Sequence, residues 1–153
     1  MTIVIECCFQ SLLVWRIMKR LFAGLNLEGR NPVIISETDL YGKIISANDP
    51  FCAISGYTRD ELIGRSHNII RHPGMPKELF RHLWMTIKQG DTFRAIIKNR
   101  AKDGGHYWVN ATIMPVFQGG EIVRYVGGRH LITDDKLAEE LFQKQMIGFV
   151  NKV

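Results

Sequence analysis

The sequence predicts an α+β domain in which a five-stranded antiparallel sheet carries helices on one face, with flanking helices at the N- and C-terminal ends. Three observations lead to this prediction. Two short β-favouring runs, at residues 33–37 and 43–47, are joined by a turn. Several short helical segments and one longer helix follow. Three longer alternating runs then succeed one another, separated only by glycine-containing turns.

The first two β-runs form a predicted hairpin. Residues 33–37 (VIISE) and 43–47 (KIISA) are rich in isoleucine, which favours the pleated conformation of a strand. The TDLYG segment between them ends at Gly42, a residue that tolerates the positive φ of a tight turn.

Short helices are predicted after this hairpin. Asp49 can cap the first helix, Pro50 suits its first turn and Gly56 ends it. Thr58 and Glu61 have the spacing of a capping box and predict the start of a second helix.

A longer helix is predicted over residues 77–89, with Pro76 at its start and Gly90 at its end. At ~3.6 residues per turn its apolar side chains share one face, which we expect to lie on the sheet. These side chains are Leu79, Phe80, Leu83, Trp84 and Ile87. Strands are then predicted at 92–102, 107–117 and 122–131. A final helix follows, capped by Thr133 or Asp134.

The chain is expected to divide into an N-terminal flanking helix or cap (1–30), a main domain (31–133) and a C-terminal helix (134–153). The apolar N-terminal segment contains Glu6 and Arg16, so no run approaches the ~20 residues that a membrane-spanning helix needs. We expect this segment to pack on the domain or on a second copy, giving a homodimer through the flanking helices. Peripheral contact with a membrane surface is the alternative.

Composition narrows the function classes. The net charge is +5, but the basic residues are scattered, which argues against nucleic-acid binding. The three cysteines, Cys7, Cys8 and Cys52, form no CxxC motif and no metal-ligand spacing, as expected of a reduced, cytoplasmic chain.

The order of these elements, with ANDPFCAISGYTRDELIG after the second strand, resembles a PAS domain over residues 33–133. More specifically, SHNIIRHPGMP, then Trp84 and then IKNRAKDGGHYWV resemble the flavin-binding PAS domains of bacterial aerotaxis and energy-taxis receptors. The resemblance implies non-covalent binding of FAD, with FMN second. It also implies that the redox state of the flavin passes to a chemotaxis-type signalling protein, such as the receptor half of a two-protein energy-taxis system.

The sequence departs from that family at Gly74, where the family motif has an acid in its FAD-binding cluster. This departure favours an alternative function, a cofactor-free PAS module that dimerises or docks a signalling protein. A second departure is Phe93, which stands where the family often has a tryptophan and still supplies an aromatic ring.

Arg71 and His72 match the ligand-binding pair of the family. An arginine fork suits the pyrophosphate of a dinucleotide or a flavin carbonyl. The alternative is that the pair caps the preceding short helix and closes the loop. Asn48 has two equal interpretations, a contact with the adenine or the edge of the ring and the N-cap of a helix.

Asn99 precedes Trp108 by nine residues. In flavin-binding light-sensing relatives, an Asn at this spacing hydrogen-bonds the flavin ring. Strand alternation places two groups of residues on the pocket face, which are Phe93, Ala95, Ile97 and Asn99, and Val109, Ala111 and Ile113. Trp84 is expected to pack on the ligand or in the core, and Trp108 to face outward under a terminal helix or a second copy. An Asn that only bonds the adjoining turn is the alternative for position 99.

Other chemistries find no support in the pattern. The spacing of His67, His72 and His82 fits no compact metal site. Helical phasing points His82 to solvent, which argues against an axial haem ligand from this helix. Cys52 lies in the wrong helix for a cysteinyl–flavin adduct, and no paired acid and base indicate an enzyme.

Overall fold

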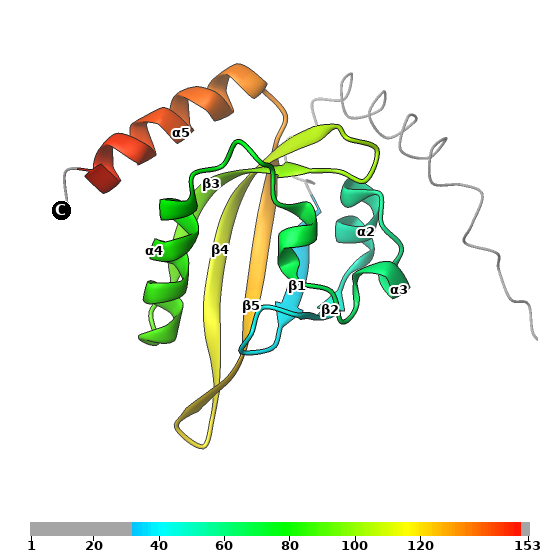
Figure 1. Ribbon diagram of the computed structural model, residues 1–153, viewed down its shortest axis with the longest axis vertical. Helices are drawn as coiled ribbons and strands as arrows, with labels where there is room; N and C mark the ends of the chain where they lie inside the picture. Colours follow the sequence, from blue (N-terminus) through cyan, green and yellow to red (C-terminus); the bar gives the residue numbers. More distant parts are fainter. Residues whose placement is uncertain (1–31, 151–153) are drawn as a thin grey trace, which may run out of the picture.

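Figure 1 shows the computed structural model, in which residues 32–150 are described. Its strands form one antiparallel sheet in the order β2-β1-β5-β4-β3. The strands are β1 (Ile34–Thr38), β2 (Ile44–Ala47), β3 (Phe93–Arg100), β4 (His106–Gln118) and β5 (Glu121–Ile132). The helices are α2 (Asp49–Ser55), α3 (Arg59–Leu62), η1 (His67–Ile70), α4 (Lys77–Lys88) and α5 (Asp135–Val150).

This arrangement confirms the predicted α+β class and the five-stranded antiparallel sheet with helices over one face. The longer helix and the three long strands end within two residues of their predicted limits. The expectations for residues 1–30 lie outside the described residues, and the proposed domain limits stay predictions. Between residues 32 and 150, no helix is both long and apolar enough to cross a bilayer.

The start of α2 corrects one prediction and confirms another, because Asp49 is not its cap and Asn48 has the N-cap role that was one of its two interpretations. Asn48, and not Asp49, is the N-cap, and its side-chain oxygen accepts from the Phe51 amide at 3.1 Å. The same side chain accepts from the Ile35 amide (3.0 Å) and donates to the Val33 carbonyl (2.8 Å). An amide side chain both accepts and donates, so Asn48 joins α2 to β1 in a way that a carboxylate cannot. The predicted capping box of α3 is present.

Alternation along the strands places the predicted inner residues in the core. Every one of them is buried, namely Phe93, Ala95, Ile97, Asn99, Val109, Ala111 and Ile113. Trp108 belongs to the opposite set and contacts Phe142 of α5, with ring centroids 5.7 Å apart. The C-terminal helix therefore covers Trp108, which is one of the two roles expected for it.

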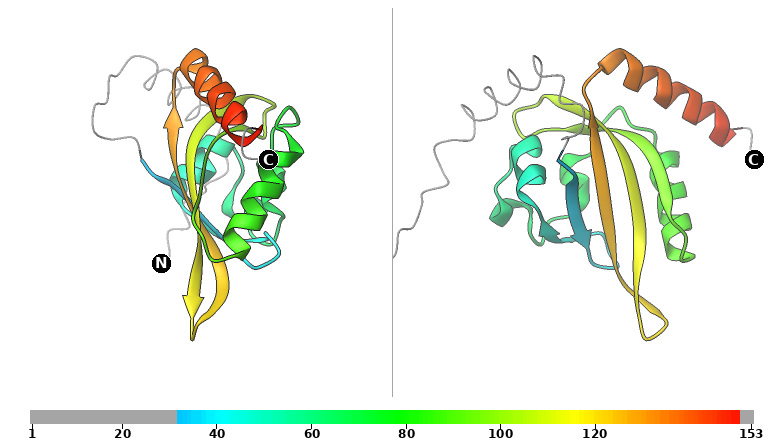
Figure 2. Two further views of the ribbon diagram at one scale, coloured as in Figure 1. Left: turned by 90° about the vertical axis from the view of Figure 1, so that its left-hand side faces the viewer. Right: turned by 180° about the vertical axis from the view of Figure 1, so that it is seen from behind.

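Helix α5 also covers part of the outer edge of β3, on the side away from β4. The side-chain oxygen of Gln145 accepts from the Ile96 amide at 2.7 Å, and its nitrogen donates to the Ile96 carbonyl at 3.2 Å. The next outward amide, that of Lys98, donates to the sulfur of Met75 at 3.4 Å. Figure 2 shows α5 running from the end of β5 across this edge of the sheet. One side chain of α5 thus takes the place of a neighbouring strand.

Replacing Gln145 with leucine should loosen α5 from β3, because both backbone groups of Ile96 lose their partner. We expect a loss of about 1–2 kcal/mol in the free energy of unfolding, together with faster hydrogen exchange at the Ile96 amide. Gln143→Leu is the matched control, since the side chain of Gln143 donates to Glu139 on its own helix and, among the described residues, bonds no strand. Equal exchange rates in the two variants would contradict the assigned role.

Candidate functional site

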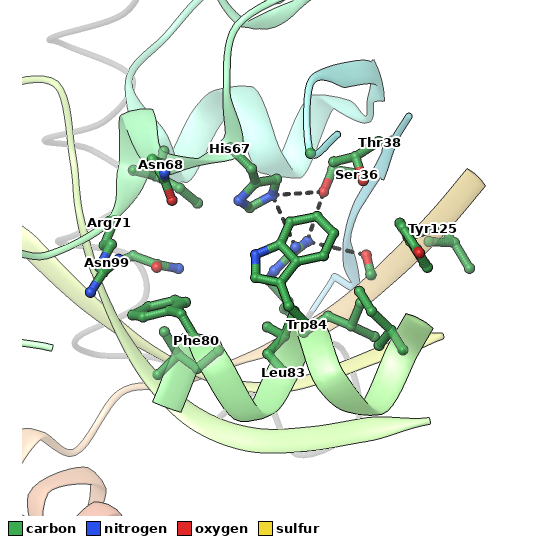
Figure 3. A pocket seen from close by; sticks show the side chains of 18 residues that line it. Ser36, Thr38, His67, Asn68, Arg71, Phe80, Leu83, Trp84, Asn99 and Tyr125 are labelled. Carbon is green, nitrogen blue, oxygen red and sulfur yellow. Dashed lines mark hydrogen bonds between the residues drawn. The ribbon is translucent and has the colours of Figure 1, made fainter. Parts of the chain in front are cut away.

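A cavity of about 90 Å³ lies between the inner face of the sheet and the segment formed by η1 and α4. Figure 3 shows its lining side chains, which come from β1, η1, α4 and the three long strands. Four of the eight predicted ligand-binding residues line it, and these are Arg71, Trp84, Ile97 and Asn99. The other four lie elsewhere. Asn48 caps α2, Phe93 and Val109 are buried in the sheet, and His72 lies in the loop before α4.

Arg71 and Asn99 meet at one end of the cavity. Their residues form an isolated antiparallel bridge, which ties the end of η1 to β3. The guanidinium of Arg71 lies 3.9 Å from the centre of the Phe80 ring and donates to the Met75 carbonyl at 3.4 Å. A planar cation and a buried amide therefore stand side by side, as recognition of a polar ring edge requires.

Trp84 packs across the cavity from α4. Its ring meets Tyr125 edge to face at 5.7 Å. Gly42, in the turn between β1 and β2, leaves room for it, because a Cβ there would lie 2.9 Å from the Trp84 ring. The turn glycine predicted from the sequence thus has two roles. Its positive φ of 80° allows the turn, and its lack of a side chain leaves room for Trp84.

The structure adds a buried polar cluster that the sequence did not reveal. The guanidinium of Arg129 donates to Ser36 Oγ (3.0 Å), the Gly127 carbonyl (3.1 Å) and His67 Nε2 (3.0 Å). His67 Nε2 also lies 3.0 Å from Ser36 Oγ, as drawn in Figure 3. Because an arginine can only donate, Nε2 is the accepting nitrogen and the proton of the neutral ring is on Nδ1.

Burial controls the charges in this cluster. Burial, followed by the charge of Arg129, lowers the pKa of His67 to about 3. Burial also lowers the pKa of Arg129 to about 10, so the guanidinium is still charged near neutrality. The His67 residue as a whole is half-buried, and it lines the cavity. At neutral pH the cluster is therefore one cation surrounded by neutral acceptors.

Strand alternation contained a signal for Arg129 that the sequence interpretation did not use. Tyr125, Gly127 and Arg129 share one face of β5, and all three are buried. A Cβ at Gly127 would lie 2.7 Å from Arg129 Nη2, so the glycine makes room for the guanidinium. An arginine placed two residues after a glycine on an inner strand face is the pattern that could have found it.

The remaining histidines lie outside the cavity. His82 does not point freely to solvent as expected, because its ring stacks on Phe149 of α5 at 5.2 Å. His72 Nδ1 accepts from the Gly74 amide at 3.0 Å, and the ring meets His106 edge to face at 6.3 Å. Partial burial, followed by neighbouring positive charges, lowers the pKa of His72. Within residues 32–150, no three His, Cys, Asp or Glu residues are grouped to hold a metal ion.

Gly42→Ala should destabilise the domain more than Gly64→Ala does. Both glycines have φ of 80°, but only Gly42 faces a neighbour, the Trp84 ring. Each substitution therefore carries the same conformational cost of about 1–2 kcal/mol. In Gly42→Ala the contact with Trp84 adds about 1 kcal/mol or more. Urea denaturation measures the difference. Equal losses would mean that Trp84 moves away freely.

His67→Gln should change how the free energy of unfolding depends on pH in the acidic range. The pKa of His67 is about 3 in the folded state and about 6.5 in an unfolded chain. The unfolded state therefore takes up the proton first, and the free energy of unfolding falls as pH drops from ~6.5 toward 3. The glutamine variant should lose this dependence, about 1.4 kcal/mol per pH unit. His130→Gln, at an exposed position of β5, should leave it unchanged. The measurement is the free energy of unfolding of the unaltered protein and of both variants at several pH values. Parallel curves of this free energy against pH for all three proteins would contradict the prediction.

Comparison with known proteins agrees with this geometry. A family model described as PAS fold matches residues 44–128. The aerotaxis receptor of Escherichia coli (strain K12) is 43% identical over 121 residues, which cover 78% of this chain and 24% of the receptor. The nitrogen fixation regulatory protein of Klebsiella pneumoniae is 30% identical over 115 residues, covering 74% and 23%. The chain spans about a quarter of the length of these relatives.

Solved structures share the fold. The light state of the blue-light photoreceptor Aureochrome1 LOV matches with a TM-score of 0.65 and 21% identity, covering 76% of this chain and 92% of that one. A Light-Oxygen-Voltage domain studied with a flavin analogue matches with a TM-score of 0.67 and 19% identity, and the match covers 87% of this chain and 96% of that domain's chain. At these identities the match concerns the fold alone. The family model and the resemblance to the aerotaxis receptor lead to one conclusion: this chain belongs to the PAS family of sensory domains.

Proposed function

We propose that the chain is a redox sensor whose pocket holds a flavin non-covalently, FAD in the first place and FMN in the second. The observation that carries the proposal is the meeting of Arg71 and Asn99 at one end of a cavity that aromatic and aliphatic side chains also line. The 43% identity to a protein named as an aerotaxis receptor supports the sensory role. A bound flavin would supply reversible electron transfer.

The residues fit such a ring in chemistry. Trp84, Phe80 and Ile97 offer flat or apolar surfaces, and the amide of Asn99 and the guanidinium of Arg71 offer polar contacts. The cavity is smaller than the roughly 300–1,000 Å³ of ordinary ligand pockets. Side chains must therefore move aside for a ring. Arg71 is suited to this, because its guanidinium rests on the Phe80 ring and its hydrogen bond to the Met75 carbonyl is long, at 3.4 Å.

The proposed signal leaves the pocket through β3. Ile97 and Asn99 face the cavity, and Ile96 between Ala95 and Ile97 is held by Gln145 of α5. A turn of the Asn99 amide on a change in ligand charge would shift the strand that holds α5. We propose that α5 then changes its contact with a chemotaxis-type signalling protein or receptor half, on the cytoplasmic side. A homodimer through the flanking helices is part of the same proposal.

A second function, a cofactor-free interaction module, is favoured by two observations. The cavity is small, and Gly74 carries no acid beside His72. In this case the pocket side chains are core, and the outer surfaces of the domain carry the interaction.

Reconstitution with FAD or FMN separates the two functions. The purified protein, incubated with either flavin and desalted, should keep an absorbance band near ~450 nm, and the released cofactor identifies the flavin. Gly74→Asp should raise the occupancy, because a carboxylate next to His72 restores the family's cluster. A Cβ at Gly74 would lie 3.1 Å from His72 Nδ1, so the ring must shift slightly. Gly148→Asp, at an exposed position of α5 with open space around it and without a positive φ, controls for added charge. Wild-type protein that stays colourless with both flavins would refute the sensor, and Gly74→Asp without added occupancy would exclude a latent FAD site.

A further inference from the structure

Arg129 is a buried cation that forms no ion pair with any residue that the structure describes. The whole residue is only 6% exposed to solvent. All three of its hydrogen-bond acceptors are neutral, namely Ser36, the Gly127 carbonyl and the imidazole of His67. Within residues 32–150, no ion pair joins Arg129 to a carboxylate.

Such an arrangement is costly for a residue with only a structural role. Buried charges are normally paired, because hydrogen bonds to neutral groups replace only part of the lost hydration. Two ionisable groups near Arg129 supply no negative charge. Burial raises the pKa of the Tyr107 hydroxyl on β4, so that phenol stays neutral. His67 on η1 is neutral as well.

The charge of Arg129 is directed at the cavity, which its side chain lines together with His67 and Ser36. Arg71 also lines the cavity, but its guanidinium lies on the Phe80 ring, at the end where Asn99 stands. A charge inside a water-poor pocket acts more strongly on a ligand than the same charge in water. The positive charge of Arg129 would therefore stabilise a ligand that gains negative charge in this pocket.

We infer that Arg129 makes this pocket bind the reduced, negatively charged form of a flavin more tightly than the oxidised form, and so raises the reduction potential of the flavin. The inference rests on the proposed function and adds a specific role to one residue. The neutral oxidised ring takes two electrons and one proton to become a reduced ring with one negative charge. Arg129 favours that charge and opposes uptake of a second proton, which would make the ring neutral. In the experiment the electrons come from dithionite.

The first test uses the unaltered protein reconstituted with FAD. Its reduction potential is measured between pH 6 and 8 by stepwise reduction with dithionite, followed by absorbance. Uptake of one proton with two electrons should lower the potential by about 30 mV per pH unit, and uptake of two protons by about 60 mV. The lower slope is expected over the whole range. The higher slope would overturn the inference.

The second test compares Arg129→Gln with Arg129→Lys. Glutamine keeps some hydrogen bonding without charge, and lysine keeps the charge without the planar fork. Glutamine should weaken binding of the reduced flavin at least tenfold more than binding of the oxidised flavin, which lowers the potential by about 30 mV. Lysine should retain most of the preference. Arg94→Gln, at an exposed position of β3, is the control and should leave the potential unchanged.

The outcomes separate the two levels of the proposal. If neither flavin form binds to the unaltered protein, the proposed function fails, and this inference fails with it. If Arg129→Gln weakens both forms equally, the pocket binds flavin but Arg129 has no preference for charge, and the inference alone is overturned. If the glutamine variant does not fold, the slope measured with the unaltered protein decides.

Discussion

The pocket of this PAS domain is arranged around one enclosed cation. Arg129 enters from β5, and the groups that accept its hydrogen bonds come from β1, η1 and β5 itself. The missing side chain of Gly127 gives the guanidinium its space. His67 must stay neutral to accept from it, which fixes the tautomer and places η1 against the sheet. The same contacts that satisfy the cation therefore join elements that lie far apart in the sequence.

Strand β3 connects this pocket with the outside of the domain. Its inner residues line the cavity and its bridge to Arg71 closes one end. Its free edge is held by a loop sulfur and by the Gln145 amide. A small movement of β3 must be felt on both sides, because packed interiors transmit displacement with little compression. No separate relay is needed between the pocket and α5.

The sequence was most informative where a simple period decides which way a side chain points. Alternation located Ile97 and Asn99, and helical phasing located Trp84, all of which line the cavity. Position 129 was missed because a charged residue on a strand is normally taken to face solvent. Its partners, at positions 36 and 67, become neighbours only when the sheet forms. The difference at α2 has a local cause, since Asn48 and Asp49 are both good caps and only the bonds to β1 favour Asn48.

The Gln145 contact has a consequence for solubility. Exposed strand edges invite pairing with other chains, and proteins protect them by covering, bending or charging them. Here the cover is a helix that holds Ile96 by two side-chain hydrogen bonds. Any state in which α5 leaves the sheet therefore exposes an unpaired edge beside the Trp108 ring. The lifetime of such a state is limited by the risk of edge-to-edge aggregation, unless a binding partner covers the edge in turn.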